Sequence, residues 1–273
     1  MSNLHRNLAP VTEAAWAQIE DEARRTFKRN IAGRRVVDVA GPDGPALSAV
    51  GTGHIHPLDT HTEGVRVMAR QVQPLIELRA PFTVTRAAVD DVERGAQDSD
   101  WQPVKDAAKK IAFAEDRAIV DGLSSADIGG IAPGSSNPAL TLPGNAVEIT
   151  DTVAKALSAL RLAGVDGPYS LLLSAEAYTE VAETTDHGYP VREHVSRMLG
   201  DGGEVIWAPA IQGGLLVSTR GGDYELQLGQ DLSIGYLSHT DDTIELYLQE
   251  SLTFMAFTAE SSVVLNAPST ATK

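Results

Sequence analysis

The sequence contains no cysteine, which excludes disulfide bonds and thiolate chemistry. It also has no apolar run long enough to cross a bilayer, although 42% of its 273 residues are hydrophobic. The stretch MSNLHRNLAP has no apolar segment after its basic residues, so we expect no secretory signal. These absences predict a protein without a membrane span and favour the cytoplasm.

Basic residues are few compared with acidic ones. Lys and Arg number 22 against 37 Asp and Glu, which gives a formal charge of −15 at pH 7. A chain of this charge repels a phosphate backbone, so we expect no nucleic acid partner. The simplest role of such an acidic balance is solubility.

Catalytic motifs are also missing. No GxSxG elbow, HExxH helix or phosphate-binding glycine loop is present, and GTGH at Gly51 and IGGIAPGSS at Ile128 lack the strand-to-helix context of such loops. The acidic pairs at residues 90–91 and 241–242 fall at predicted turns, where Asp is common. We therefore expect no catalytic residue in this chain and no enzyme activity.

Two groups of histidines offer alternatives to this view. On a strand, His54 and His56 would share a face that binds a metal with nearby His61, but no full ligand set is visible and we expect no metal. His187 beside Asp186 would make an acid–base pair. The string DHGYP instead favours a tight glycine turn between two helices, exposed at a tip that lines an opening in an assembly.

The spacing of apolar residues predicts several helices. The first is expected over residues 12–30, with Thr12 as its cap and Gly33 at its end. The most regular helix is expected over residues 100–121, with Pro103 in its first turn. Others are expected from Asp151, over 175–184 and over 191–199, with a loop over 124–145.

Strands are predicted at YSLLLSA, EVIWAPAI and GLLVSTR, and period-two alternation marks two more at residues 224–228 and 244–248. The insert GQDLSIGY lies between the last two. Its plainest interpretation is a strand connection with Gly229 and Gly235 as hinges. Helices and strands interleave without a regular βαβ repeat, so the fold class is α+β.

Residues 45–75 are predicted to form a long β-hairpin with little core of its own, because apolar residues alternate there without a compact stripe. An isolated hairpin is marginally stable in water. We therefore expect this hairpin to pack on another subunit.

Several longer strings resemble one known family. Between residues 7 and 265 the chain contains, in this order, NLAPVTEAAWAQIEDEARRTFKRNIAGRRVVDVAGPDG, PLIELRAPFTV, DDVERG, GPYSLLL, HGYP and RGGDYELQLGQDLSIGY. These strings are similar to those of encapsulins, also named linocin-type bacteriocins. The likeness is greatest to actinobacterial members, including mycobacterial culture-filtrate antigens, and only the tail NAPSTATK lies outside it.

The resemblance implies the HK97-like fold of phage major capsid proteins, which has a peripheral domain, an axial domain and an extended loop. Applied to this chain, it implies a division into the following parts: an N-terminal arm and helix of the peripheral domain at 1–44, the extended loop at 45–75, the peripheral domain with its long helix at 76–132, the axial domain at 133–210, peripheral-domain strands at 211–265 and a flexible tail at 266–273.

The resemblance also implies partners. Identical subunits, about 60 of them, would close into an icosahedral nanocompartment in the cytoplasm. It would enclose a cargo enzyme, a dye-decolorising peroxidase or a ferritin-like protein, with a role in oxidative stress or iron storage. The cargo would dock on the inner wall through a C-terminal targeting peptide, and the likeness to culture-filtrate antigens adds the culture filtrate as a second location.

Two sets of residues acquire roles from the resemblance. The targeting peptide would bind at the strings NIAGRRVVD and GQDLSIG, through Ile31, Arg34, Asp38, Asp231, Leu232, Ser233 and Ile234. The pore at the fivefold axis would be lined by Asp186, His187, Gly188 and Tyr189.

One family feature is not expected. Some encapsulins have been associated with flavin through an aromatic residue after FTV, where this chain has Ala87 and Ala88 beyond Arg86. Without a ring for stacking, we expect no flavin and no other cofactor.

Two other classes of protein remain as alternatives. A phage or prophage major capsid protein of the same fold would need a basic interior for DNA, which the charge of −15 disfavours. An enzyme would need a nucleophile, a base and an orienting group, and no such set is visible.

Overall fold

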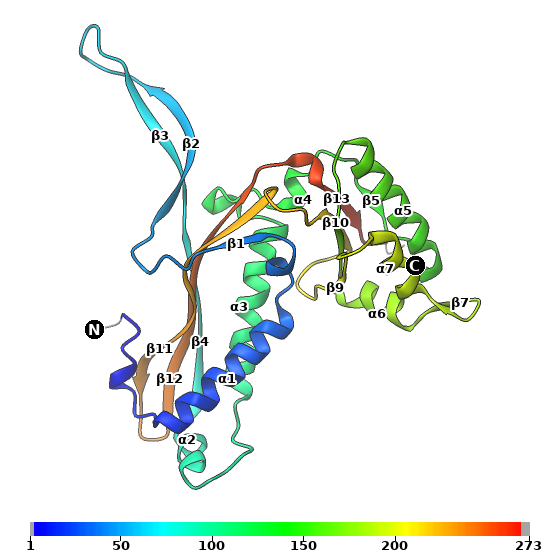
Figure 1. The fold of residues 1–273 in the computed structure, drawn as a ribbon. Helices are drawn as coiled ribbons and strands as arrows, with labels where there is room; N and C mark the ends of the chain where they lie inside the picture. The colour runs from blue at the N-terminus through cyan, green and yellow to red at the C-terminus, as the bar shows by residue number, and fades with distance from the viewer. Residues whose placement is uncertain (1–2, 269–273) are drawn as a thin grey trace, which may run out of the picture.

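The computed structural model describes residues 3–268 of the chain, and Figure 1 shows their arrangement. Its α-helices are α1 (Glu13–Asn30), α2 (Arg86–Glu93), α3 (Gln102–Val120), α4 (Ile131–Gly134), α5 (Ala146–Leu162), α6 (Ala175–Glu183) and α7 (Val191–Leu199). Its strands are β1 (Asp38–Ala40), β2 (Ala49–Leu58), β3 (Val67–Pro74), β4 (Ile76–Thr85), β5 (Leu140–Thr141), β6 (Tyr169–Leu173), β7 (Thr185–Asp186), β8 (Tyr189–Pro190), β9 (Val205–Trp207), β10 (Gly214–Ser218), β11 (Tyr224–His239), β12 (Thr243–Ala256) and β13 (Ser262–Asn266).

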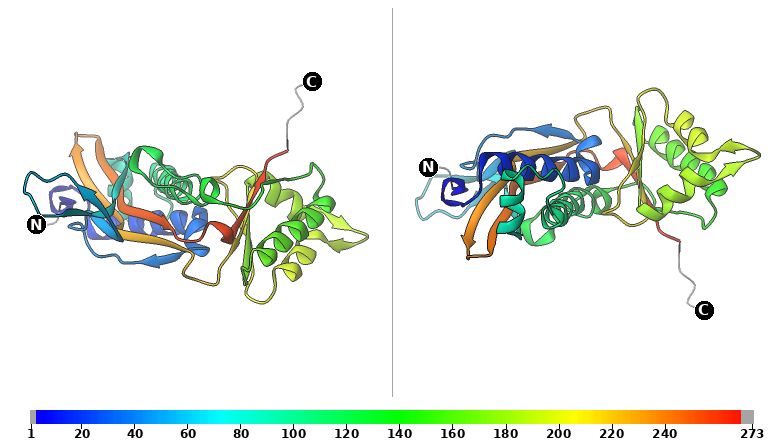
Figure 2. Two further views of the ribbon diagram at one scale, coloured as in Figure 1. Left: turned by 90° about the horizontal axis from the view of Figure 1, so that it is seen from above. Right: turned by 90° about the horizontal axis from the view of Figure 1, so that it is seen from below.

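The first sheet has the strand order β1-β11-β12-β4. Helices α1 and α3 pack on one face of it, because both present an apolar stripe of the expected helical spacing. Ile19 and Phe27 of α1 and Ile111 of α3 are buried there with Leu246 and Leu248 of β12. This sheet and its two helices form one end of the molecule in Figure 2.

The second sheet has the order β5-β13-β10-β6-β9, and α5, α6 and α7 pack against it. Its inner strand β6, which lies between β10 and β9, is buried along its whole length, as its apolar sequence predicts. Strands β10 and β13 pair within this sheet, although the predicted division groups them with the strands of 211–265. The order of the strands in the sequence does not reveal this pairing, because β11 and β12 of the first sheet lie between β10 and β13 in the chain.

A third cluster of buried residues joins the two sheets. It contains Ile119 of α3, Leu172 and Ile206 of the second sheet, and Leu226 and Phe254 of the first. The two ends of the molecule therefore share a continuous core at their junction.

The predicted hairpin is confirmed: β2 and β3 pair antiparallel from Ala49–Pro74 to Leu58–Val67. It projects away from both sheets, as Figure 1 shows. Several of its apolar side chains are left largely uncovered by residues 3–268: Ile55 is 58% exposed and Val72 55%.

Several predicted element ends can be compared with the structure. Thr12 caps α1 by accepting a hydrogen bond from Ala15 N, as predicted. The prediction that Gly33 ends this helix is wrong, because α1 ends at Asn30 and Gly33 opens a short 3-10 turn, Gly33–Arg35. Helix α5 begins before the predicted Asp151, with Asn145 as its cap.

The loop expected over 124–145 contains the short helix α4 and the strand β5. The acidic pair at residues 90–91 lies in helix α2, not at a turn, because Thr85 caps a helix that runs through it.

The interpretation of residues 229–236 as a connection is wrong. Strand β11 runs through them without a break and stays paired with β12. The pairing shifts register between Leu228 and Gln230 and again between Gln230 and Ser233, which marks a β-bulge. The bulge interrupts the period-two pattern, and this interruption makes the string look like an insert.

The string DHGYP forms a tight turn between the two-residue strands β7 and β8. His187 and Gly188 both have positive φ, 46° and 84°, as a two-residue hairpin turn requires. No helix within residues 3–268 is long and apolar enough to cross a membrane. Of the predicted tail, Asn266 belongs to β13, and residues 269–273 lie outside the described residues.

Candidate functional site

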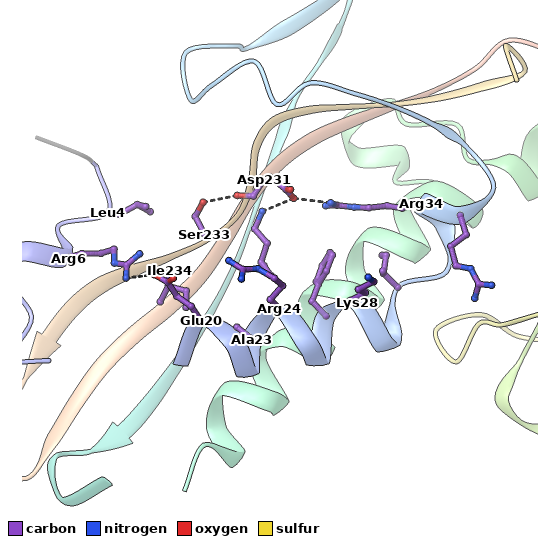
Figure 3. A pocket seen from close by; sticks show the side chains of 14 residues that line it. Leu4, Arg6, Glu20, Ala23, Arg24, Lys28, Arg34, Asp231, Ser233 and Ile234 are labelled. Carbon is purple, nitrogen blue, oxygen red and sulfur yellow. Dashed lines mark hydrogen bonds and ion pairs between the residues drawn. The ribbon is translucent and has the colours of Figure 1, made fainter. Parts of the chain in front are cut away.

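A pocket of about 840 Å³ lies between helix α1 and strand β11. Figure 3 shows the side chains that line it, with α1 on one side and the bulged part of β11 on the other. Six of the seven residues predicted to bind a peptide line it: Ile31, Arg34, Asp231, Leu232, Ser233 and Ile234.

The seventh predicted residue, Asp38, does not line this pocket. It lies in β1, and its carboxylate accepts a hydrogen bond of 2.6 Å from Gly222 N. It lines a separate small cleft with Arg35 and Asp223. The 3-10 turn after α1 rotates the chain, so Asp38 leaves the side on which Arg34 lies.

The apolar wall of the pocket consists of Phe27 from α1, Ile31 directly after it, and Leu232 and Ile234 from β11. Phe27, Ile31 and Ile234 belong to the core of the first sheet, whereas Leu232 is only half-buried. The wall is therefore the edge of the core where it borders the pocket, and such an edge suits an apolar ligand side chain.

At the polar end of the pocket, the guanidinium of Arg34 contacts three carboxylates. Its Nε and Nη2 donate to Glu115, both at 2.7 Å, its Nη1 donates to Asp231 at 2.8 Å and its Nη2 lies 3.2 Å from Glu250. Burial alone would lower the pKa of Arg34, but the hydrogen bonds and charges of Glu115 and Asp231 outweigh burial and raise the pKa. The guanidinium is also 4.9 Å from the ring of Phe27.

Two carboxyl groups near this arginine, Asp116 and the already named Glu250, are buried and have raised pKa values. Burial raises the pKa of Asp116 to about 7, against the opposing effect of hydrogen bonds that Gly33 N and Ala32 N donate to it. Burial also raises the pKa of Glu250 well above its usual range, with the charge of Glu115 as the next cause. The hydrogen bonds from Ala32 N and Gly33 N to Asp116 link the residues after α1 to helix α3.

The N-terminal arm closes the other end of the pocket, and the sequence did not indicate this. Tyr236 N donates to Leu4 O at 2.9 Å, Tyr247 Oη donates to Asn3 O at 3.4 Å, and Arg6 pairs with Glu20 of α1. Both Leu4 and Arg6 line the pocket.

Apart from Arg35 of the 3-10 turn, the remaining lining residues come from one face of α1, and their helical spacing was a usable signal: Glu20, Ala23, Arg24, Phe27 and Lys28.

Within the described part of the chain, part of the β11 edge faces the pocket without a partner strand. Strand β1 pairs with β11 only from Glu225 to Gln227. Tyr236 N–H points away from β12 toward Leu4, and alternate residues of an antiparallel strand point the same way, so the backbone groups of Ile234 also face outward. An extended peptide could add to this edge.

Sequence comparison decides the family. A family model described as "Encapsulating protein for peroxidase" matches residues 1–253. The chain belongs to the encapsulin family. A type 1 encapsulin shell protein of Brevibacterium linens is 66% identical over 97% of this chain and 100% of the relative. One from Mycobacterium tuberculosis is 61% identical, with the same coverage.

Solved structures confirm the HK97-like fold expected of an encapsulin. A virus-like particle from Pyrococcus furiosus superposes with a TM-score of 0.66 and 16% identity, over 92% of this chain and 99% of that one. A chain from Mycobacterium phage Bobi gives 0.59 at 16% identity, over 88% and 91%. The α+β class is confirmed with it.

The other predicted site residues lie far from the pocket. Asp186, His187, Gly188 and Tyr189 form the tip of the β7–β8 turn, where His187 Nε2 is 3.8 Å from Asp186. His54 and His56 lie exposed on β2. Within residues 3–268, no three His, Asp or Glu side chains gather as metal ligands. Ala87 and Ala88 lie in the first turn of α2. The expectation that no flavin binds there stays a prediction from the sequence.

Proposed function

We propose that copies of this encapsulin assemble into a closed icosahedral shell, a structural compartment whose chemistry is supplied by an enclosed enzyme. The observation that carries this proposal is the β2–β3 hairpin, which projects with exposed apolar side chains and has no core of its own. Such a surface needs a partner, and close relatives are named shell proteins.

The pocket between α1 and β11 is the proposed docking site for a C-terminal targeting peptide of the cargo. It combines an apolar wall, an arginine held by buried carboxylates and an open strand edge, and such features bind short extended peptides. The family description names a peroxidase, so a dye-decolorising peroxidase is the first proposed cargo and a ferritin-like protein the second.

The fivefold pore is proposed to lie at the β7–β8 tip, where the turn projects from α6 and α7 (Figure 1). No bound flavin is proposed, and the shell is proposed to reside inside the cell.

Co-expression tests the docking proposal. The shell chain is produced with a peroxidase that ends in its native C-terminal segment, and in parallel with the same enzyme lacking that segment. Particles are purified and their contents identified by mass spectrometry. The proposal expects peroxidase inside the particles only with the intact segment, and equal loading of both enzymes would contradict it.

A further inference from the structure

The β2–β3 hairpin carries an exposed thioether. The sequence has four methionines and no cysteine, so methionine sulfur is the only sulfur of the chain that an oxidant can reach. Among the methionines of residues 3–268, Met68 of β3 is 45% exposed, whereas Met198 and Met255 are half-buried. Susceptibility to oxidation follows exposure. Met68 is therefore the first of these three to react in a free subunit.

Met68 belongs to an apolar face of the hairpin. It pairs with Pro57 of β2, and two residues further along β3 Arg70 pairs with Ile55. Cross-strand partners and alternate residues of a strand lie on the same face. The members of this face, which we call the apolar hairpin face, are Ile55, Pro57, Met68 and Val72, with Arg70 as the charged residue among its paired positions.

The apolar hairpin face is left open by the single chain. Ile55, diagonal to Met68 across the two strands, and Val72, on the same strand as Met68, are both more than half exposed. The hairpin projects away from both sheets, as Figure 1 shows. In the proposed shell a neighbouring copy covers this face, so the sulfur of Met68 passes from solvent into a contact between subunits.

Hydroperoxides change the chemistry of this side chain. The sulfur lone pair attacks one peroxide oxygen and the O–O bond breaks, so sulfur loses two electrons and the peroxide is reduced. The oxygen that stays on sulfur passes its proton to the departing oxygen, which leaves as water or an alcohol. The product, a sulfoxide, is polar, and burial of its oxygen without a donor is unfavourable. A methionine sulfoxide reductase reverses the step.

We infer that Met68 is a reversible oxidation site that controls assembly. Subunits that carry the thioether join a shell, subunits that carry the sulfoxide stay outside it, and closure of the shell then shields the sulfur. This inference rests on the proposed assembly and adds a modification that regulates it. The proposed cargo, a peroxidase, consumes the same class of oxidant that modifies Met68.

Two substitutions separate the polarity of this side chain from its size. Met68→Gln imitates the polar sulfoxide, whereas Met68→Leu keeps an apolar side chain of similar volume that cannot form a sulfoxide. Native mass spectrometry measures the assembled fraction of each full-length chain over a range of subunit concentrations. Met68→Leu should assemble as wild type does. Met68→Gln should need a roughly tenfold higher concentration for half-assembly, because it buries an unpaired polar group.

Hydrogen peroxide tests the modification itself. Wild type and Met68→Leu are dissociated, treated with peroxide, freed of it and returned to assembly conditions, beside untreated samples of both. The two chains share their other methionines, so a difference between them reports Met68 alone. Oxidised wild type should lose most of its assembled fraction and regain it after treatment with methionine sulfoxide reductase, whereas Met68→Leu should lose much less.

Intact shells supply the last comparison. In these, peroxide should not oxidise Met68 ahead of Met198 and Met255, although Met68 is the most exposed of the three in the single chain. Preferential oxidation of Met68 in intact shells, normal assembly of Met68→Gln, or equal loss in oxidised wild type and Met68→Leu would overturn the inference and leave the shell function standing. Absence of particles from untreated wild type would instead overturn the shell function.

Discussion

At the scale of single residues, the site depends on carboxyl groups that the fold has buried. Arg34 faces Glu115, Asp231 and Glu250, and one oxygen of Glu250 has no hydrogen-bond partner within the described part of the chain. One guanidinium cannot neutralise all of these carboxylates together with nearby Asp116, so the cluster favours retention of a proton. We therefore expect the end of α1, which forms a wall of the pocket, to be sensitive to pH.

Asp116 allows a test of this sensitivity. Burial raises its pKa to about 7 from an unfolded value of 3.8, so the folded state binds this proton more tightly. Its contribution to stability grows as the pH falls through about 7 and is complete below the unfolded value. As the pH is lowered from about 8 to about 5, the thermal unfolding midpoint of wild type should therefore rise relative to that of Asp116→Asn.

The matched control is Asp201→Asn, which removes an exposed carboxylate. Its difference from wild type should change little over the same range. A difference for Asp116→Asn that is independent of pH would show that this carboxyl does not hold a proton near neutrality.

Gly235 is required for a different reason. A Cβ at this position would collide with the ring of Tyr247 from β12, a ring whose centroid is also 4.3 Å from Arg79 Cζ. Gly235→Ala should lower the free energy of unfolding by about 1–3 kcal/mol, as overpacking does. Chemical denaturation measures it, with Gly129→Ala as control because a Cβ there meets nothing within 4 Å. Equal stability of the two variants would contradict this packing account.

Leu232 is the best residue for testing the apolar wall. Ile234 is 4% exposed and belongs to the core with α1, so its replacement by Asp would disturb folding as well as binding. Leu232 is half-buried at the pocket. Leu232→Asn should weaken binding of the peroxidase's C-terminal segment about tenfold while shells stay intact. Leu237→Asn, at an exposed leucine of the same strand outside the pocket, should bind as wild type does; equal loss in both would refute the wall.

At the scale of elements, local sequence patterns predicted the helices and strands that neighbouring residues determine. They did not predict contacts between segments that are distant in the chain. The stripe of α1, the cap at Thr12 and the apolar strand β6 were predictable, because each follows from neighbouring residues. The joining of β13 to β10 was not, since no local pattern specifies a partner from elsewhere in the chain.

The pocket shows the same division. Six of its residues were found through two strings that a family resemblance connected, not through any spacing between them. Leu4 and Arg6 were missed because the arm has no periodicity of its own and is held by contacts with β11 and α1. Asp38 does not line the pocket with the other six, because the turn at Gly33–Arg35 redirects the chain.

The hairpin supports a prediction about assembly. Removing residues 53–63 deletes the distal half of β2 and the turn, while both sheets keep their strands. The variant should fold, with helical and sheet signals by circular dichroism, but should no longer form particles in electron micrographs. Normal particles from this variant would show that the exposed apolar residues of the hairpin are not needed for contacts between subunits.

At the scale of the whole molecule, the chain has two cores joined at one cluster and a hairpin that lies outside both. Each sheet has a core of its own, whereas apolar side chains of the hairpin stay exposed. In the proposed shell, closure of identical subunits covers the hairpin and places the peptide pocket on one side of the wall. Any catalysis is then proposed to belong to the enclosed enzyme.

The mass of the purified chain in solution is the most direct test of this central claim. Native mass spectrometry of the protein, produced alone at neutral pH, should give a closed particle of about 60 chains of 28.9 kDa each, with little free subunit. A stable monomer or small open oligomer at micromolar concentration would contradict the account.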